Sequence, residues 1–261
     1  MSRRFSWVVV ASVAGWLWAS SAAAEILPVP EAIARLHAPS EETNVLRSPT
    51  GDPIGEQRFH VAVDGTRLTF EAATHFRTGE EWDEHGEMDL SNGFRARHSA
   101  KTVRRDGKVV QEQDVDFTTG KVAWLVDGTH TERTMTLPPD TYIGSMMAMV
   151  LASVAHGAPA MRSFEALVFR PDPVVVTLRA DAVDETDPAP GRPGEPATKL
   201  RLRADLGPVK NVLFASLIPT HYFWFTRGSV PEFAAFEGKL SNGLEVVMTT
   251  EAPVTTTAHV R

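Results

Sequence analysis

The chain has 261 residues, no cysteine and a formal net charge of −7 at pH 7. Without cysteine there can be no disulfide, no zinc site with thiolate ligands, no catalytic cysteine and no lipid-modified N-terminal cysteine. The excess of acidic residues argues against nucleic acid as a partner, and the length is enough for a single core of buried apolar side chains.

The first 24 residues have the pattern of a cleavable signal peptide. Arg3 and Arg4 supply positive charge, residues 5–18 form an uncharged apolar run, and residues 22–24 are alanines at the cleavage positions. The run is too short to span a bilayer comfortably, so an uncleaved N-terminal anchor is the less favoured interpretation. We expect export to the periplasm or secretion. No later apolar stretch reaches spanning length, so we expect no integral membrane protein after cleavage.

The rest of the chain is predicted to contain an irregular lead-in and one domain. Residues 25–56 contain five prolines and are predicted to be irregular around a short helix at 30–37. Residues 57–261 are predicted to form a single β-barrel-like domain, because no second domain and no tandem repeat of fixed period is visible in them.

Turn signals recur along this domain. Asn-Gly and Asp-Gly pairs between alternating runs are strong signals for β-hairpins, because the central residues adopt positive φ. The Gly-containing pairs are Asp64-Gly65, Asn92-Gly93, Asp106-Gly107, Thr119-Gly120, Asp127-Gly128 and Asn242-Gly243. They predict an antiparallel meander through the middle of the chain and a further hairpin near its end.

The registers of these hairpins separate apolar from charged residues. The predicted apolar pairs include Phe59–Phe70, Val61–Leu68, Leu90–Phe94, Met88–Ala96, Val115–Trp124 and Phe236–Met248. The predicted charged pairs, on the solvent face, include Asp89–Arg95, Glu87–Arg97, Asp83–Lys101 and Lys101–Glu112. The predicted buried face contains Met88, Leu90, Phe94, Ala96, His98, Ala100, Val115, Phe117, Val122 and Trp124.

A different pattern covers residues 140–155. No charged residue follows Asp140 in this segment, its apolar residues fall at helical spacing, and Gly157 can end a helix. A helix that is apolar on nearly all sides is buried, so we expect it to pack against the concave face of the sheet. Further strands are predicted at 162–169, 173–182, 198–206, 209–218, 220–226 and 233–250, with an exposed loop at 183–197.

Few features of the sequence point to catalysis or metal binding. The acidic run at 80–84 before His85 could form a metal or acid–base cluster, but its register favours a solvated charged face. The histidines show none of the usual metal-ligand spacings, and no nucleophile-elbow or nucleotide-binding motif is present. We therefore predict no catalytic residue, no metal site and no cofactor.

Several residues are candidates for binding a ligand. They are His98, Trp124, Arg133, Met146, Met147, Tyr222 and Trp224. His98 and Arg133 could hold a ligand's polar end beside Trp124, although a hydrogen-bonded core histidine is the favoured alternative. The helix methionines and the aromatic strand 220–226 could line an apolar cavity or patch, and a covered central strand is the favoured alternative for the latter.

The organisation of the chain resembles a known group. It combines an export signal, a meander closing on Leu137-Pro138-Pro139-Asp140-Thr141, an apolar helix and the strand Tyr222-Phe223-Trp224-Phe225. In this it is similar to uncharacterised periplasmic β-barrel proteins of Gram-negative bacteria, akin to cell-envelope integrity barrel proteins, whose folds look like the half-open LolA/LolB lipoprotein carriers. The resemblance covers most of residues 55–250 and implies no catalytic residues. Some relatives use a disulfide, which this chain cannot form.

Together these observations predict an all-β, mainly antiparallel barrel or half-barrel with one buried helix in its concave face. The leading hypothesis is a non-enzymatic envelope protein that binds a hydrophobic ligand, an acyl chain, or a lipidated or apolar partner. A periplasmic scaffolding protein acting through its outer surface is the alternative, and an unrecognised hydrolase is the less favoured third hypothesis.

Overall fold

The computed structural model describes residues 40–126, 128–156, 161–170, 172–183, 188–205, 220–227 and 232–250. The predicted signal peptide, the predicted helix at 30–37 and the predicted strand at 209–218 lie outside the described residues, as does Asp127 of one predicted turn. No helix in the described segments has the length and apolar character needed to cross a membrane.

One sheet of 15 strands accounts for most of the described residues. The strands are β1 (Ser40–Arg47), β2 (Pro53–Asp64), β3 (Arg67–Phe76), β4 (Glu80–Asp89), β5 (Arg95–Arg105), β6 (Lys108–Asp116), β7 (Lys121–Val126), β8 (Thr129–Thr134), β9 (Thr141–Tyr142), β10 (Met161–Phe169), β11 (Pro173–Val183), β12 (Ala197–Ala204), β13 (Thr220–Thr226), β14 (Phe233–Lys239) and β15 (Glu245–Thr250). Neighbouring strands are antiparallel, except β9 and β10, which are parallel. The prediction of a mainly antiparallel all-β fold is confirmed.

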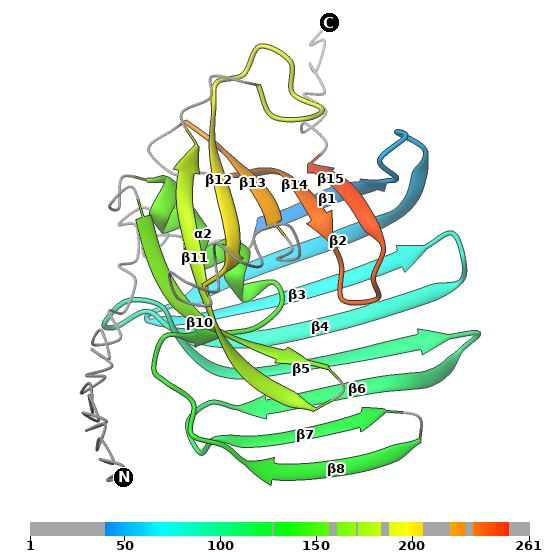
Figure 1. Cartoon of the computed structure of the whole chain (residues 1–261), viewed down its shortest axis with the longest axis vertical. Helices are drawn as coiled ribbons and strands as arrows, with labels where there is room; N and C mark the ends of the chain where they lie inside the picture. Colours follow the sequence, from blue (N-terminus) through cyan, green and yellow to red (C-terminus); the bar gives the residue numbers. More distant parts are fainter. Residues whose placement is uncertain are drawn as a thin grey trace, which may run out of the picture.

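The strand order brings the two ends of the described chain together in the middle of the sheet. The order is β8-β7-β6-β5-β4-β3-β2-β1-β15-β14-β13-β12-β11-β10-β9, so β1 pairs with both β2 and β15. The sheet is open, because its end strands β8 and β9 are not paired with each other. Figure 1 shows β3 to β8 as a broad layer with β10 and β11 crossing in front of it.

The sheet curls until strands far apart in its order touch. The Tyr142 hydroxyl of β9 donates a hydrogen bond of 2.7 Å to the carbonyl oxygen of Phe94, just before β5. The rings of Trp124 in β7 and Phe169 in β10 meet edge to face, with centroids 6.3 Å apart. One large cluster of buried apolar side chains lies between these contacts. It includes residues of both halves of the sheet, β1 to β8 and β9 to β15. The two halves therefore share one core.

The single helix of the described residues, α2 (Met146–Ala155), contributes to this core. It contacts β11, β12 and β13, and Met146 is fully buried near Gly86 of β4. The predicted helix at 140–155 began six residues too early, because Thr141 and Tyr142 extend along β10 as strand β9. This pairing removes them from the helix.

Two other predicted boundaries were wrong. The lead-in at 25–56 was predicted to be irregular, yet it contains β1 and the start of β2. The consecutive residues Val45 and Leu46 are both buried, since β1 is a central strand, and a strand covered on both faces lacks the alternation by which it could be recognised. The predicted loop at 183–197 begins with the last residue of β11 and ends with the first residue of β12.

Hairpin registers were predicted correctly beside the β4–β5 turn and in the β14–β15 hairpin. The pairs confirmed are Met88–Ala96, Asp89–Arg95 and Phe236–Met248. The pairs observed in place of wrong predictions are Phe59–Ala72, Val61–Phe70, Val115–Val122, Glu87–His98, Asp83–Thr102 and Lys101–Gln113. The β2–β3 turn is centred one residue later than predicted, and bulges interrupt the pairs β4–β5 and β5–β6. Each bulge inserts one residue and shifts every pair beyond it.

Candidate functional site

The structure places His98 on the outer face of β5, so its predicted inward position was wrong. Ala96 is buried as expected, but the bulge that follows reverses the alternation, and Ser99 is the next buried residue. The His98 side chain is 38% exposed, with Nε2 3.3 Å from Asp114 Oδ2. Its ring centroid lies 5.7 Å from that of His85. His98 therefore does not line the core.

Trp124 and Arg133 come together as predicted, but in a contact between the two halves of the sheet. Trp124 is buried, and the Arg133 guanidinium lies 5.7 Å from its ring centroid. Arg133 also donates a hydrogen bond to the carbonyl oxygen of Pro173 at the start of β11. Trp124 and Arg133 thereby connect β7 and β8 with β10 and β11.

The remaining candidates do not form one site. Met146 is fully buried in the core and Met147 is half-buried. Tyr222 and Trp224 alternate with Phe223 and Phe225, and only the two phenylalanines belong to the main core. Trp224 instead forms a small separate cluster, against which Tyr222 packs. The Lys199 ammonium group lies 4.8 Å from the Tyr222 ring centroid and 5.2 Å from that of Trp224. The aromatic side chains of β13 are therefore divided between two clusters.

A polar cluster on the inner face of β4 and β5 was not anticipated. We call it the rim cluster, and it comprises Glu80, Trp82, Glu84, Lys101, Ser241 and Asn242. The bulge in β5 turns Lys101 to the same face as the buried Ser99 and Val103, whereas the predicted register had placed it on the solvent face. Its ammonium nitrogen lies 3.7 Å from the Trp82 ring centroid and 3.2 Å from Ser241 Oγ.

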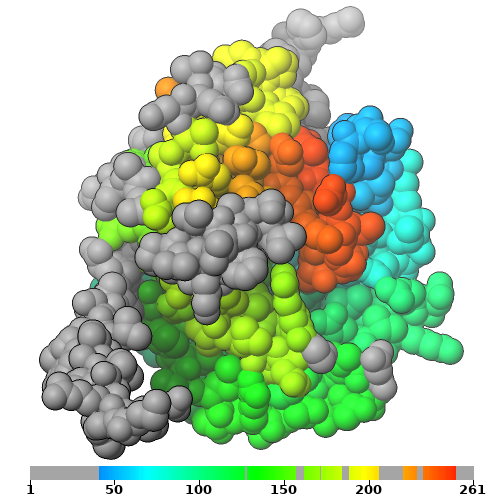
Figure 2. Space-filling view, viewed as in Figure 1, coloured from blue at the N-terminus to red at the C-terminus, as the bar shows by residue number. Residues whose placement is uncertain are grey.

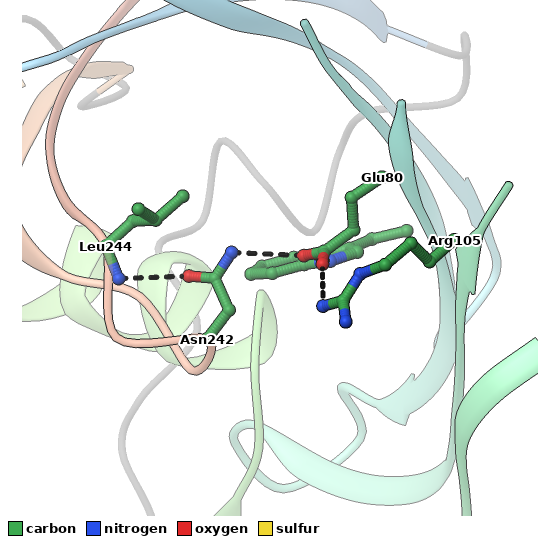
Figure 3. A network of polar contacts seen from close by, with 5 residues as sticks. Glu80, Arg105, Asn242 and Leu244 are labelled. Atoms are coloured by element: carbon green, nitrogen blue, oxygen red, sulfur yellow. Dashed lines mark hydrogen bonds and ion pairs between the residues drawn. The ribbon is translucent and has the colours of Figure 1, made fainter. Parts of the chain in front are cut away.

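The Glu80 carboxylate connects residues of three different segments by hydrogen bonds. Figure 3 shows its carboxylate between Asn242, from the turn joining β14 and β15, and Arg105, from the end of β5. Glu80 accepts hydrogen bonds from Asn242 Nδ2 at 3.1 Å, Arg105 at 2.6 Å and Trp82 Nε1 at 2.8 Å. Burial raises the pKa of this carboxyl, but the three hydrogen bonds and the charge of Arg105 together lower it by more, so its pKa lies below the ordinary value. The turn at 240–244 is thereby held against the inner face of β4.

Glu84 fastens the start of α2 to the same rim. Its two oxygens accept hydrogen bonds from the Ser145 backbone N–H at 2.8 Å and from Ser145 Oγ at 3.0 Å. Ser145 makes no side-chain cap of its own, and the first turn of α2 contains no acidic residue. The Glu84 carboxylate therefore supplies the acceptor and the negative charge that a helix N-terminus favours.

Lys101 is the least compensated charge of the rim cluster. In the described part of the chain, no carboxylate lies within 4.0 Å of its ammonium group, since its direct contacts are a hydroxyl and an indole ring. Burial lowers the pKa of Lys101, while the nearby carboxylates of Glu84 and Glu80 act to raise it, and the net change is downward. The Lys101 ammonium group can therefore bind an anionic group that enters between the two halves of the sheet.

The acidic run at 80–84 was predicted to be a solvated face, which holds only for alternate residues. Glu81 and Asp83 point outward, and Asp83 pairs with Arg104. Glu80 is buried and Glu84 is half-buried, and both belong to the rim cluster. Strict alternation along β4 could have predicted the inward position of Glu80 and Glu84, because it places both on the same face as Trp82.

No protein-family model and no curated protein matches the chain. A solved structure, a β-barrel-like protein of the domain of unknown function DUF1849 from Brucella abortus, is similar to it with a TM-score of 0.50 and 11% sequence identity. The similarity covers 84% of this chain and 96% of that chain. At this identity the likeness concerns the fold, and it supports a β-barrel-like architecture.

Proposed function

We propose that this protein is a non-enzymatic envelope protein, exported by its N-terminal signal peptide, which binds a hydrophobic ligand between the two halves of its curled sheet. An acyl chain, or a lipidated or apolar partner, would occupy the position of α2. The observation that supports this most directly is an uncharged helix that contacts β11, β12 and β13 and is hydrogen-bonded just before its start to Glu84 of β4.

The helix is suited to giving way to such a ligand. Its sequence, MMAMVLASVA, contains no charged residue, and five of its six buried residues belong to the large apolar core. Methionine side chains are flexible and can repack around different shapes. A ligand that replaced the helix would recover about 0.8 kcal/mol for each buried CH₂ group. An acyl chain can therefore offset much of the cost of moving α2.

Native mass spectrometry and lipid extraction of the protein from its native host provide the first test. We expect a bound lipid, and saturable uptake of a fluorescent fatty acid by the emptied protein. A ligand-free mass together with no saturable uptake contradicts the proposal.

The binding position can be tested with ¹³C-methyl methionine labelling. The methyl signals of Met146, Met147 and Met149 should shift on addition of a fatty acid. The exposed Val109 offers a matched control, because Val109→Asp removes surface apolar area far from the helix and should leave uptake unchanged. Uptake that is lost in this variant, with unmoved helix methyl signals, would indicate adventitious surface binding.

A second candidate function is supported by the outer face of the sheet. An open groove there is lined by Arg97, His98, Asp114, Asp116, Lys121 and Glu132, among others. Alternating charges of this kind suit a protein partner, as expected of a scaffold. Crosslinking in intact cells separates the two functions, since a scaffold should give a specific protein adduct through this groove and no bound lipid.

A further inference from the structure

We infer that Lys101 binds a monoanionic end group, a carboxylate or a phosphodiester, of the ligand whose apolar part displaces α2. This inference rests on the proposed function and adds the polar chemistry of the ligand. It starts from the placement of Lys101 on the inner face of the sheet, where its ammonium group lies over Trp82 of the apolar core.

The first step concerns the partners of the rim cluster. The Glu80 carboxylate is already occupied by three donors, and Glu84 by the two donors of Ser145. Among the described residues, the direct contacts of the Lys101 ammonium group are the Ser241 hydroxyl and the face of Trp82. A partly buried ammonium group without a direct ion pair gains from an entering anion, because charge-assisted hydrogen bonds are the strongest polar contacts.

The second step concerns the charge of the end group. Glu80 and Glu84 both act electrostatically on Lys101 and would repel a second negative charge on the ligand. A phosphomonoester carries nearly two negative charges at neutral pH. The cluster therefore favours an end group with a single negative charge.

The third step concerns the path of the apolar chain. Glu84, the residue of β4 paired with Lys101, lies two positions before Gly86 on the same inner face. Met146, in the first turn of α2, packs where a side chain at Gly86 would stand. Two residues of a strand span about 7 Å, so a displaced helix N-terminus opens apolar space directly beside the ammonium group. The end group and the chain would then occupy adjoining parts of one site.

The experiment compares a fluorescent fatty acid with its methyl ester of the same chain length at neutral pH. Wild-type protein should bind the acid about tenfold more tightly than the ester, and Lys101→Met should remove this preference. Lys108→Met is the matched control, because it makes the same change of charge at the exposed start of β6 and should preserve the preference. A phosphodiester and a phosphomonoester lipid then test the charge rule.

The possible outcomes separate the inference from the proposed function. Equal binding of acid and ester by the wild type, or a preference that survives Lys101→Met, overturns the inference while the proposed function stands. Failure of both probes to bind overturns the proposed function as well. If Lys101→Met does not fold, Lys101→Gln is judged by the same criterion. Tighter binding of the phosphomonoester than of the phosphodiester also contradicts the inference.

Discussion

Asn242 donates a hydrogen bond of 3.1 Å to Glu80 across 162 residues of sequence. Asn242 lies in the turn between β14 and β15, and Glu80 is the first residue of β4, so the bond joins the two halves of the curled sheet. The Asn242 side-chain oxygen also accepts the backbone N–H of Leu244 at 3.1 Å, which organises the turn itself (Figure 3). The Asn242 side chain thus stabilises the turn and also binds the turn to β4.

Replacement of Asn242 by alanine should lower the free energy of unfolding by about 1–2 kcal/mol, because it leaves a buried carboxylate short of one donor. The matched control is Asn92→Ala, in the similar Leu-Ser-Asn-Gly turn between β4 and β5, where the side-chain amide lies 3.5 Å from the Ser91 hydroxyl instead of bonding a carboxylate of another strand. Urea denaturation of both variants measures the difference. Equal losses in the two variants would show that the docking bond to Glu80 contributes little.

Replacement of Glu84 by alanine should destabilise the protein by about 1–2 kcal/mol, because Ser145 and the first turn of α2 lose their acceptor. Under the proposed function it should also speed the uptake of a fatty acid, since the helix start is released. Glu81→Ala is the control, because Glu81 is exposed on the same strand and its ion pair is with the exposed His75. Stopped-flow fluorescence measures the uptake rate. An uptake rate identical in wild type and Glu84→Ala would show that release of the α2 N-terminus does not limit the uptake of the fatty acid.

Local patterns were sufficient to predict most strands of the fold. Gly-containing turns and alternation act within a few residues, so some pairs beside a turn, such as Met88 with Ala96, could be predicted from the sequence. The start of α2 could not, because Thr141 and Tyr142 are helix-compatible in isolation and become a strand only through pairing with β10. Long-range pairing overrides local preference at such positions.

The candidate site was predicted poorly for a related reason. A single inserted residue in β5 exchanged the positions of His98 and Lys101, so that the predicted inward histidine faces solvent and the predicted outward lysine faces the core side. A bulge depends on how two strands fit together, and no residue type in β5 marks it. The docking of Asn242 on Glu80 likewise depends on the curl of the whole sheet.

Introduction of a methyl group at Gly86 tests how tightly β4 packs against Phe70 of β3 and Met146 of α2. A Cβ atom at this position would stand 2.4 Å from the Phe70 ring and 3.0 Å from the Met146 methyl carbon. Gly86→Ala should therefore destabilise the protein by about 1–3 kcal/mol through overpacking. Phe70→Leu makes room, so the double variant should lose less stability than the sum of the single variants. Thermal or urea unfolding gives the coupling, and strict additivity would mean that position 86 is not in tight contact with Phe70 of β3.

The buried carboxyl of Asp140 makes stability depend on pH. Asp140 is 4% exposed, and its Oδ1 has no hydrogen-bond partner among the described residues. Burial raises the pKa of this carboxyl, its own backbone N–H lowers it, and Glu165 raises it further, with a net upward change. A carboxyl whose pKa is higher in the folded state binds its proton more tightly there, so its contribution to stability falls as pH rises from the unfolded pKa through the folded pKa.

Replacement of Asp140 by asparagine removes this charge and should stabilise the protein at pH 7.5 by about 1 kcal/mol, the lower end for an unsatisfied buried polar group. The gain should disappear below about pH 3.5, where the aspartate is protonated in both states. Urea denaturation across this pH range measures it, with Asp172→Asn as an exposed control that should change little at any pH. A loss of stability in Asp140→Asn at pH 7.5 would mean that the folded protein holds the charged carboxylate with a favourable partner.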